Sequence, residues 1–178
     1  SEPGWVELFR RLNATPGGTH RLIKLRERIK LLLRDGSPHL KALDDGLLKL
    51  FRYWFNSSFL VLEKIDWSTP ANVLEKIIEY EAVHEINSWN DLRARLAPSD
   101  RQCFAFFHPL IPEDPLIFVE VALTNEIPTS IEKVIKINRE EVEYNKINTA
   151  VFYSISNCQD GLAGISFGNF LIKKVAHR

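Results

Sequence analysis

Thr149–Val175 reads TAVFYSISNCQDGLAGISFGNFLIKKV, and this stretch decides how the second half of the chain is organised. Its first part, Ala150–Ser156, has the alternating side-chain directions of a β-strand. A short loop with two glycines, Gly161 and Gly164, follows it. The strongly apolar run Ile165–Val175 then has the character of a helix. We therefore predict a strand, a glycine-containing loop and a helix in direct succession.

This succession is suited to binding an anion. The first N–H groups of a helix have no partner within the helix, and the helix dipole is positive at that end. Glycines, which lack a Cβ, let a phosphate approach the backbone closely. The spacing matches neither G-x-G-x-x-G nor G-x-x-x-x-G-K-[ST], so it predicts neither a dinucleotide fingerprint nor a Walker loop. The same arrangement also occurs as a plain connection between strand and helix, and both interpretations stay open at this point.

Two earlier segments have apolar residues at helical spacing. The pattern predicts one helix over 19–34 and another over 40–55. The turn-forming sequence Asp35-Gly36-Ser37-Pro38 lies between them and favours an antiparallel helix pair. Because the helical period ends near Phe55, we expect a helical domain over 1–55 and a second domain over 56–178.

The second domain alternates short strand-like and helix-like segments. Ser68-Thr69-Pro70 and Ser88 are typical of helix starts, and Thr129 with Glu132 fits a capping box. A proline-rich turn over 109–115 favours an antiparallel pair of strands around it. The expected order is a strand (59–65), two helices (71–80 and 89–96), two strands (103–107 and 116–123), a helix (129–137), and then the strand and helix described above. This order predicts an α+β fold on a mixed or antiparallel sheet.

Composition argues against several classes of function. The 23 basic and 23 acidic side chains cancel, so no overall charge favours nucleic acid or an anionic membrane. The longest apolar stretch, 116–123, is far too short to span a membrane. Cys103 and Cys158 are too few for a disulfide framework, which suggests a reducing, cytoplasmic location. His84-Glu85 begins like the zinc motif H-E-x-x-H, but Ser88 stands where the second histidine is needed, so we predict no metal site.

Four blocks of the sequence resemble the malonyl-CoA decarboxylase family, in the family's order. They are RRLNATPGGTHRLIKLRERI, WFNSSFLVLEKIDWSTPANVLEKIIEYEAVHEI, FFHPLIPEDPLIFVEVALT and FYSISNCQDGLAGISFGNFLIKKV, and they cover nearly the whole chain. The sequence resembles bacterial members more closely than animal ones. The resemblance implies a helical, oligomerising N-terminal domain followed by the first part of a catalytic domain, with the mixed sheet and helices of the Gcn5-related N-acetyltransferases. In that fold the loop after the fourth strand holds the pyrophosphate of coenzyme A.

The resemblance also implies a reaction and a site. The family decarboxylates malonyl-CoA to acetyl-CoA and carbon dioxide in fatty acid metabolism, without a separate cofactor or metal. We therefore expect malonyl-CoA and acetyl-CoA as ligands and a homo-oligomer formed through the helical domain. The family's catalytic serine and histidine lie in blocks that match nothing in these 178 residues, so we expect both beyond Arg178 and no catalytic residue in this chain. The substrate-binding residues that the resemblance implies are Ser154 on the strand and the continuous segment Ala163, Gly164, Ile165, Ser166, Phe167, Gly168 and Asn169.

The strand serines have two interpretations. In a regular strand Phe152, Ser154 and Ser156 face the same way, which places two hydroxyls on one face. These hydroxyls either border the substrate cleft or bond to neighbouring backbone within the sheet. Animal members of the family carry Glu where this chain has Ser166, so a role that depends on that carboxylate is not carried over.

Two other classes of function also remain open. A CoA-dependent acyltransferase would use the same strand, loop and helix together with a pocket for an acyl acceptor. A non-catalytic CoA-binding or assembly module is the other class, suggested by the apolar helix pair. A polar stripe on the last helix, formed by Ser166, Asn169 and Lys173, either contacts coenzyme A or is the solvated side of that helix.

Overall fold

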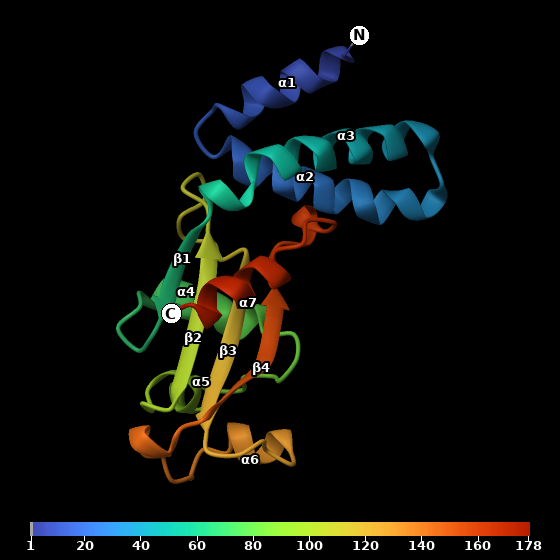
Figure 1. Cartoon of the computed structure of the whole chain (residues 1–178). Coiled ribbons are helices and arrows are strands. Elements are labelled where there is room, and N and C mark those ends of the chain that lie inside the picture. The colour runs from blue at the N-terminus through green and yellow to red at the C-terminus, as the bar shows by residue number, and fades with distance from the viewer. Residues whose placement is uncertain (1) are drawn as a thin grey trace.

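The computed structural model describes residues 2–178. It has the predicted α+β composition, with three helices at one end of the molecule and a four-stranded sheet with its own helices below them (Figure 1). The sheet is entirely antiparallel, which settles the choice between a mixed and an antiparallel sheet for this part of the chain.

The N-terminal helices are α1 (Gly4–Asn13), α2 (Gly18–Leu32) and α3 (Pro38–Trp54). Helices α2 and α3 form the predicted antiparallel pair, here called the helical hairpin (Figure 1). Gly36, with a φ of 75°, makes the turn between them. The Ser37 hydroxyl accepts a hydrogen bond from the N–H of Leu40 at 3.5 Å and so caps α3.

Helix α1 was not predicted from the sequence. Its apolar residues Trp5, Val6, Phe9 and Leu12 do recur at helical spacing, so the signal was present in the sequence and was overlooked. The helix packs closely against α3 at Gly46, where the ring of Trp5 occupies the space that a Cβ would need.

The sheet has the strand order β1 (Val61–Ile65), β2 (Arg101–Phe107), β3 (Ile117–Thr124) and β4 (Thr149–Asn157). Its two faces carry separate cores. On one face Cys103, Ala105 and Phe107 pack against α4 (Ala71–Tyr80) and α5 (Trp89–Leu96). The opposite face packs against α7 (Gly168–Ala176) and the hairpin in one continuous core, which includes Ile23, Leu47, Phe51, Phe106, Val119, Leu162, Phe167 and Leu171. The hairpin, the loop and the sheet therefore share a core.

A β-bulge in β4 corrects the predicted direction of one side chain. Glu120 of β3 pairs with Ser154, whereas the next residue, Val121, pairs with Phe152, which leaves Tyr153 as the extra residue. Phe152 consequently packs in the core on the hairpin side and not beside Ser154. The shared face predicted for Phe152, Ser154 and Ser156 is thus wrong for Phe152, since strict alternation fails at the bulge.

Two of the predicted helices have the bounds that the sequence indicated, and the other four differ from their predicted bounds by about one to three residues at each end. The bounds of α4 and α5 are those predicted, and Ser88 caps α5 by accepting from the N–H of Asp91. Helix α7 begins at Gly168 instead of Ile165, because the residues before it remain in the loop. Helix α6 (Ile131–Ile135) lacks the predicted capping box, since Thr129 accepts from Lys133.

Within residues 2–178, none of the helices combines the length and apolar character that a membrane crossing needs.

Candidate functional site

The segment between β4 and α7 forms a compact loop over residues 158–167. A short 3-10 helix, Asp160–Leu162, opens it, and backbone bonds from Ala163 to Asp160 at 3.1 Å and from Ile165 to Leu162 at 3.2 Å close the following turns. In Figure 1 the loop rises from the end of β4 to the hairpin before the chain descends into α7. The predicted strand, loop and helix are therefore all present.

Both loop glycines face the hairpin, whereas the sequence suggested that they leave room for a phosphate. A Cβ on Gly161 would overlap the carbonyl oxygen of Ile23 in α2. Gly164 has a φ of +97°, and a Cβ there would lie 3.2 Å from the methyl carbons of Leu48 in α3. The glycines allow the loop to approach the helices closely, and only the opposite side of the loop is left for a ligand.

The start of α7 offers backbone donors next to this loop. Its first intrahelical bond runs from the N–H of Leu171 to the carbonyl of Phe167 at 2.9 Å. The N–H groups of the first turn precede that bond, and no side chain within residues 2–178 caps the helix. The positive end of the helix dipole adds to their attraction for an anion.

The structure brings seven of the eight predicted substrate-binding residues together. Within the segment 163–169, Gly164, Ser166 and Asn169 are exposed, whereas Phe167 is buried in the core. A cavity of about 210 Å³ lies against the segment and is lined by Ala163, Gly164, Ile165 and Phe167 among others. Lys173 is exposed in the last turn of α7, at the end of the helix away from the loop.

Ser154 lies apart from that segment. Its side chain is on the face covered by α4 and α5 and is only 2% exposed. The hydroxyl donates to Glu81 Oε1 at 2.7 Å, and the same carboxylate oxygen accepts from the N–H of His84 at 2.8 Å. Ser156 accepts from the N–H of Ala82 at 3.1 Å. Both strand hydroxyls therefore hold the segment that follows α4.

A pair of carboxyl groups, buried Glu120 and half-buried Glu81, lies next to Ser154. Glu120 is fully buried and pairs with Arg95 at 3.3 Å. Burial raises the pKa of Glu120 to about 8, and the nearby Glu81 carboxyl adds to this rise while Arg95 opposes it. Burial and the neighbouring Glu81 carboxyl both favour the protonated form of Glu120. Glu81 Oε2, Glu120 Oε1 and the Tyr153 hydroxyl have no hydrogen-bond partner within the described residues.

Sequence reasoning did not find this pair. Glu81 and Glu120 are 39 positions apart, and Glu81 is one of several glutamates in its segment, with Glu79 and Glu85 close by. The one available signal was Glu120, a single acid inside the most apolar stretch of the chain, where an ionisable residue needs a partner.

The contacts of His108 and His84 are those of histidines that stabilise the fold. The His108 ring connects the end of α3 to the turn after β2. Its Nε2 lies 2.9 Å from the carbonyl of Trp54, and its Nδ1 accepts from the N–H of Leu110 at 3.1 Å. Burial lowers the pKa of His108, so the neutral ring that these two bonds require is favoured. The His84 ring lies near that of Tyr153 in a tilted arrangement, with ring centroids 6.4 Å apart. Nowhere in residues 2–178 do three or more His, Cys, Asp or Glu side chains gather as a metal site would need.

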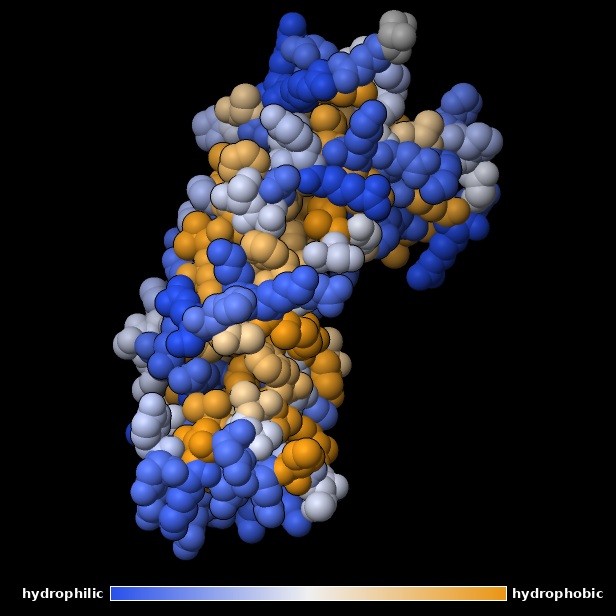
Figure 2. Space-filling view, in the orientation of Figure 1, coloured by the Kyte–Doolittle hydropathy of each residue, from blue (hydrophilic) through white to orange (hydrophobic). Residues whose placement is uncertain are grey.

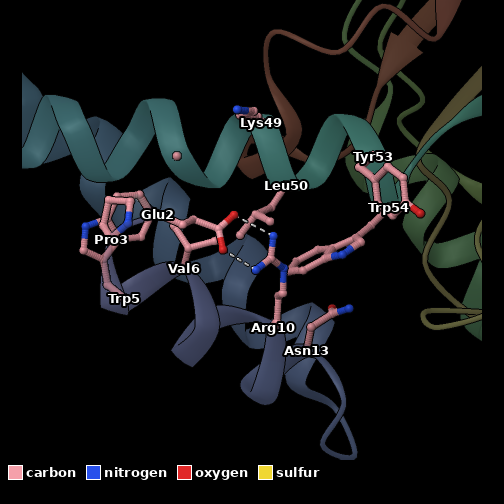
Figure 3. A pocket seen from close by; sticks show the side chains of 11 residues that line it. Glu2, Pro3, Trp5, Val6, Arg10, Asn13, Lys49, Leu50, Tyr53 and Trp54 are labelled. Carbon is pink, nitrogen blue, oxygen red and sulfur yellow. Dashed lines mark hydrogen bonds and ion pairs between the residues drawn. The ribbon is translucent and has the colours of Figure 1, made fainter.

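A larger cavity lies away from the loop. It has a volume of about 750 Å³ and opens between α1 and α3 (Figure 3). Arg10 reaches into it from α1 and is held by Glu2 at 2.6 Å, while Tyr53 and Trp54 approach from the end of α3. Tyr53 is 73% exposed, so this part of the helical region presents aromatic surface to solvent.

Comparison with known proteins identifies relatives along the whole chain. The family model described as the malonyl-CoA decarboxylase N-terminal domain matches residues 1–55, and the one described as the malonyl-CoA decarboxylase C-terminal domain matches residues 58–178. Mitochondrial malonyl-CoA decarboxylases of Anser anser anser and Rattus norvegicus are each 41% identical over 97% of the chain.

Solved structures are also similar. Malonyl-CoA decarboxylase from Rhodopseudomonas palustris is 57% identical over 99% of the chain, with a TM-score of 0.92. The enzyme from Cupriavidus metallidurans is 44% identical over 97% of the chain, with a TM-score of 0.80. The chain spans 43% and 41% of these two structures, and 35% and 36% of the Anser and Rattus proteins.

Proposed function

The chain belongs to the malonyl-CoA decarboxylase family, and on this premise we propose that it supplies the coenzyme A-binding part of an enzyme that converts malonyl-CoA to acetyl-CoA and carbon dioxide. The observation that carries the proposal is the loop over 158–167 running into the uncapped start of α7. A pyrophosphate bound there would accept hydrogen bonds from backbone N–H groups at the positive end of a helix. The proposed ligand-binding segment is 163–169.

Anchoring coenzyme A serves the chemistry at its other end. Loss of carbon dioxide from malonyl-CoA leaves a thioester enolate, whose negative charge must be stabilised and whose carbon must then receive a proton. Fixing the coenzyme A portion holds the malonyl group in one position relative to the groups that perform these steps. The proposed catalytic serine and histidine lie outside these 178 residues, and the proposed reaction uses neither a metal nor another cofactor.

The proposed catalytic fold is that of the Gcn5-related N-acetyltransferases. The order of elements from β1 to α7, with the ligand loop directly after the fourth strand, supports it. In this proposal the strands described here form the first part of a larger sheet. The proposed division into a helical domain (1–55) and a catalytic part (56–178) follows the change from α3 to β1.

Ser154 has an indirect role in this proposal. Because its hydroxyl is buried and bonded to Glu81, it contributes by fixing β4 and the segment after α4, and β4 leads directly into the ligand loop. Direct contact with the substrate would require Glu81 to release that hydroxyl.

Two asparagines provide a matched test of the anion site. Asn169 is the second residue of α7 and Asn90 is the second residue of α5, and both are exposed. In the full-length protein, Asn169→Asp should weaken coenzyme A binding about twofold to fivefold in isothermal titration, because a carboxylate repels phosphate at the helix start. Asn90→Asp introduces the same charge at an equivalent helix position and should leave binding unchanged. Equal affinities for all three proteins would contradict the proposed site.

Assembly through the helices is a second proposed function. The aromatic-lined cavity between α1 and α3 favours it, since exposed aromatic residues are enriched where protein surfaces meet (Figure 3). Light scattering of the full-length protein should give the mass of a homo-oligomer, and the mass of a single chain would contradict this part of the proposal.

A further inference from the structure

We propose that Arg26 and Arg52, both on the helical hairpin, are positioning residues for the coenzyme A loop. The inference rests on the proposed function of that loop. Arg26 is 135 residues from Gly161, which it contacts, and Arg52 is 112 residues from its own partner, Gly164. Both arginines act on the loop backbone, and neither needs to touch the ligand.

Arg26 joins three parts of the molecule. Its side chain leaves α2 and is almost completely buried, with 3% exposure. One terminal nitrogen, Nη1, donates to the carbonyl of Gly161 at 3.1 Å and to the carbonyl of Ala163. The Nε atom donates to Asp44 Oδ1 of α3 at 3.0 Å. The loop is therefore tied to both helices of the hairpin through one guanidinium group.

The contact with Ala163 fixes the direction of a particular amide. In a planar trans peptide the carbonyl and the N–H point in opposite directions. Because Arg26 draws the carbonyl of Ala163 toward the hairpin, the N–H of Gly164 in the same peptide unit points away from it. That N–H has no hydrogen-bond acceptor within residues 2–178. It is thus a free donor on the side of the loop that the ligand would occupy.

Neighbouring carbonyls are held in the same way. Arg52 Nη2 donates to the carbonyl of Gly164 at 3.3 Å, and Lys30 Nζ donates to the carbonyl of Asp160 at 3.3 Å. The close approach of Gly161 to the backbone of Ile23 adds a steric contact on the same side. Hairpin side chains therefore bind four loop carbonyls, those of Asp160, Gly161, Ala163 and Gly164, which presents the opposite side of the loop in one orientation.

Arg26 acts through geometry more than through its charge. Asp44 lies against its Nε atom and neutralises it, and both groups are buried. A lysine would keep the positive charge, but a single ammonium group does not have the planar fork that reaches a carboxylate and two carbonyls at once. We therefore expect Arg26→Lys to behave like Arg26→Ala in ligand binding.

The test compares two substrates, of which only one carries the part that the loop is proposed to bind. Malonyl-CoA carries the pyrophosphate, whereas malonyl-pantetheine ends before it. In the full-length protein, Arg26→Ala, Arg26→Lys and Arg52→Ala should each raise KM for malonyl-CoA about fivefold, the effect of one lost hydrogen bond, with kcat unchanged. KM for malonyl-pantetheine should not change. Arg28→Ala is the control, because Arg28 is exposed on the same helix and its side chain makes no hydrogen bond or ion pair within residues 2–178.

The design separates a positioning role from a merely structural one. Loss of stability alone would change kcat, or would affect both substrates equally, and either result would overturn the inference. Full recovery by Arg26→Lys would overturn the argument from the arginine fork. Arg52 is exposed, so Arg52→Ala is informative even where the Arg26 variants do not fold, as circular dichroism would reveal. If the unmodified protein shows no preference for malonyl-CoA over malonyl-pantetheine, the proposed function of the loop itself fails.

Discussion

The buried side chain of Glu120, which lies near Glu81, shows how the stability of the fold can depend on the protonation of one carboxyl group. Arg95 contacts Glu120 but also donates to the backbone carbonyls of His84 and Glu85, so its charge is shared among several acceptors. One positive charge therefore does not offset both the buried Glu120 carboxylate and the half-buried Glu81 carboxylate beside it. A proton on Glu120 resolves this conflict, and it agrees with the rise in the pKa of Glu120 caused by burial.

This proton makes stability depend on pH. The pKa of Glu120 is about 8 in the folded protein, against a reference value of 4.5, so the folded state binds more protons than the unfolded state between these values. The contribution of Glu120 is fully present below pH 4.5 and is lost as pH rises to about 8. We expect Glu120→Gln to remove that fall, which has a slope of at most about 1.4 kcal/mol per pH unit.

Thermal melting at intervals from pH 5 to pH 8 measures this difference. Glu63→Gln serves as the control, because Glu63 is an exposed residue of β1 and should leave the slope unchanged. A Glu120→Gln protein whose melting temperature falls with pH as steeply as that of the unmodified protein would mean that Glu120 is already ionised in the fold.

At the residue scale, the substrate-binding segment 163–169 stays a prediction. The family resemblance implied it, and the structure adds only that its residues lie in the loop and at the start of α7. Arg26 and Arg52 could not be identified, since their partners are carbonyl groups, which leave no trace in the amino-acid types of the loop. Ser154 was assigned to a face correctly, yet its partner Glu81 comes from a distant segment.

At the scale of elements, the order of strands and helices followed from local patterns. The bounds of α4 and α5 are set by capping residues and helical spacing, both of which are visible in the sequence. The bulge at Tyr153 and the late start of α7 were not visible, because each depends on contacts with other elements. Helix α1 differs from these cases, because its helical pattern of Trp5, Val6, Phe9 and Leu12 is visible in the sequence.

The conformation of the loop can be tested at Gly164. Gly164→Val should disturb the loop, because valine disfavours a φ of +97° and its side chain would press against Leu48. In the full-length protein we expect KM for malonyl-CoA to rise and the free energy of unfolding to fall by about 1–3 kcal/mol.

A matched substitution separates the loop from a general effect of valine. Gly4 begins α1, its φ is not positive, and a Cβ added there would have no neighbouring atom within 4 Å. Gly4→Val should therefore leave KM unchanged. Unaltered kinetics in a stably folded Gly164→Val protein would remove the loop from substrate binding.

At the scale of the whole molecule, the hairpin and the sheet cannot be treated as independent bodies. Their apolar residues meet in one core that also contains Leu162 and Phe167 of the loop. The change of sequence period near Phe55 predicted where helices give way to strands, but sequence periodicity carries no information about packing between the two parts. The structure adds that the hairpin supports the loop directly.

The β4 edge of the sheet is less well covered than the part of the sheet that packs against the hairpin. Within the described residues β4 pairs only with β3, so its other edge has unpaired backbone groups. Figure 2 shows apolar side chains at the surface over the lower part of the sheet, and Phe152 and Ile155 of β4 are only partly buried. Additional strands packed against this edge and face would bury the unpaired backbone groups of β4 and these apolar side chains.

These features lead to a prediction about the 178 residues on their own. The purified chain should form no acetyl-CoA from malonyl-CoA above background, because the proposed catalytic serine and histidine are absent from it. It should also unfold more readily than the full-length protein, since the β4 edge and the apolar face lose the burial that additional strands would provide. The full-length protein, assayed beside it at equal concentration, is the control for activity. Robust turnover by the chain, with its mass confirmed by mass spectrometry, would show that residues 1–178 contain the catalytic groups, and the carboxyl pair behind Ser154 would then be the first place to search for them.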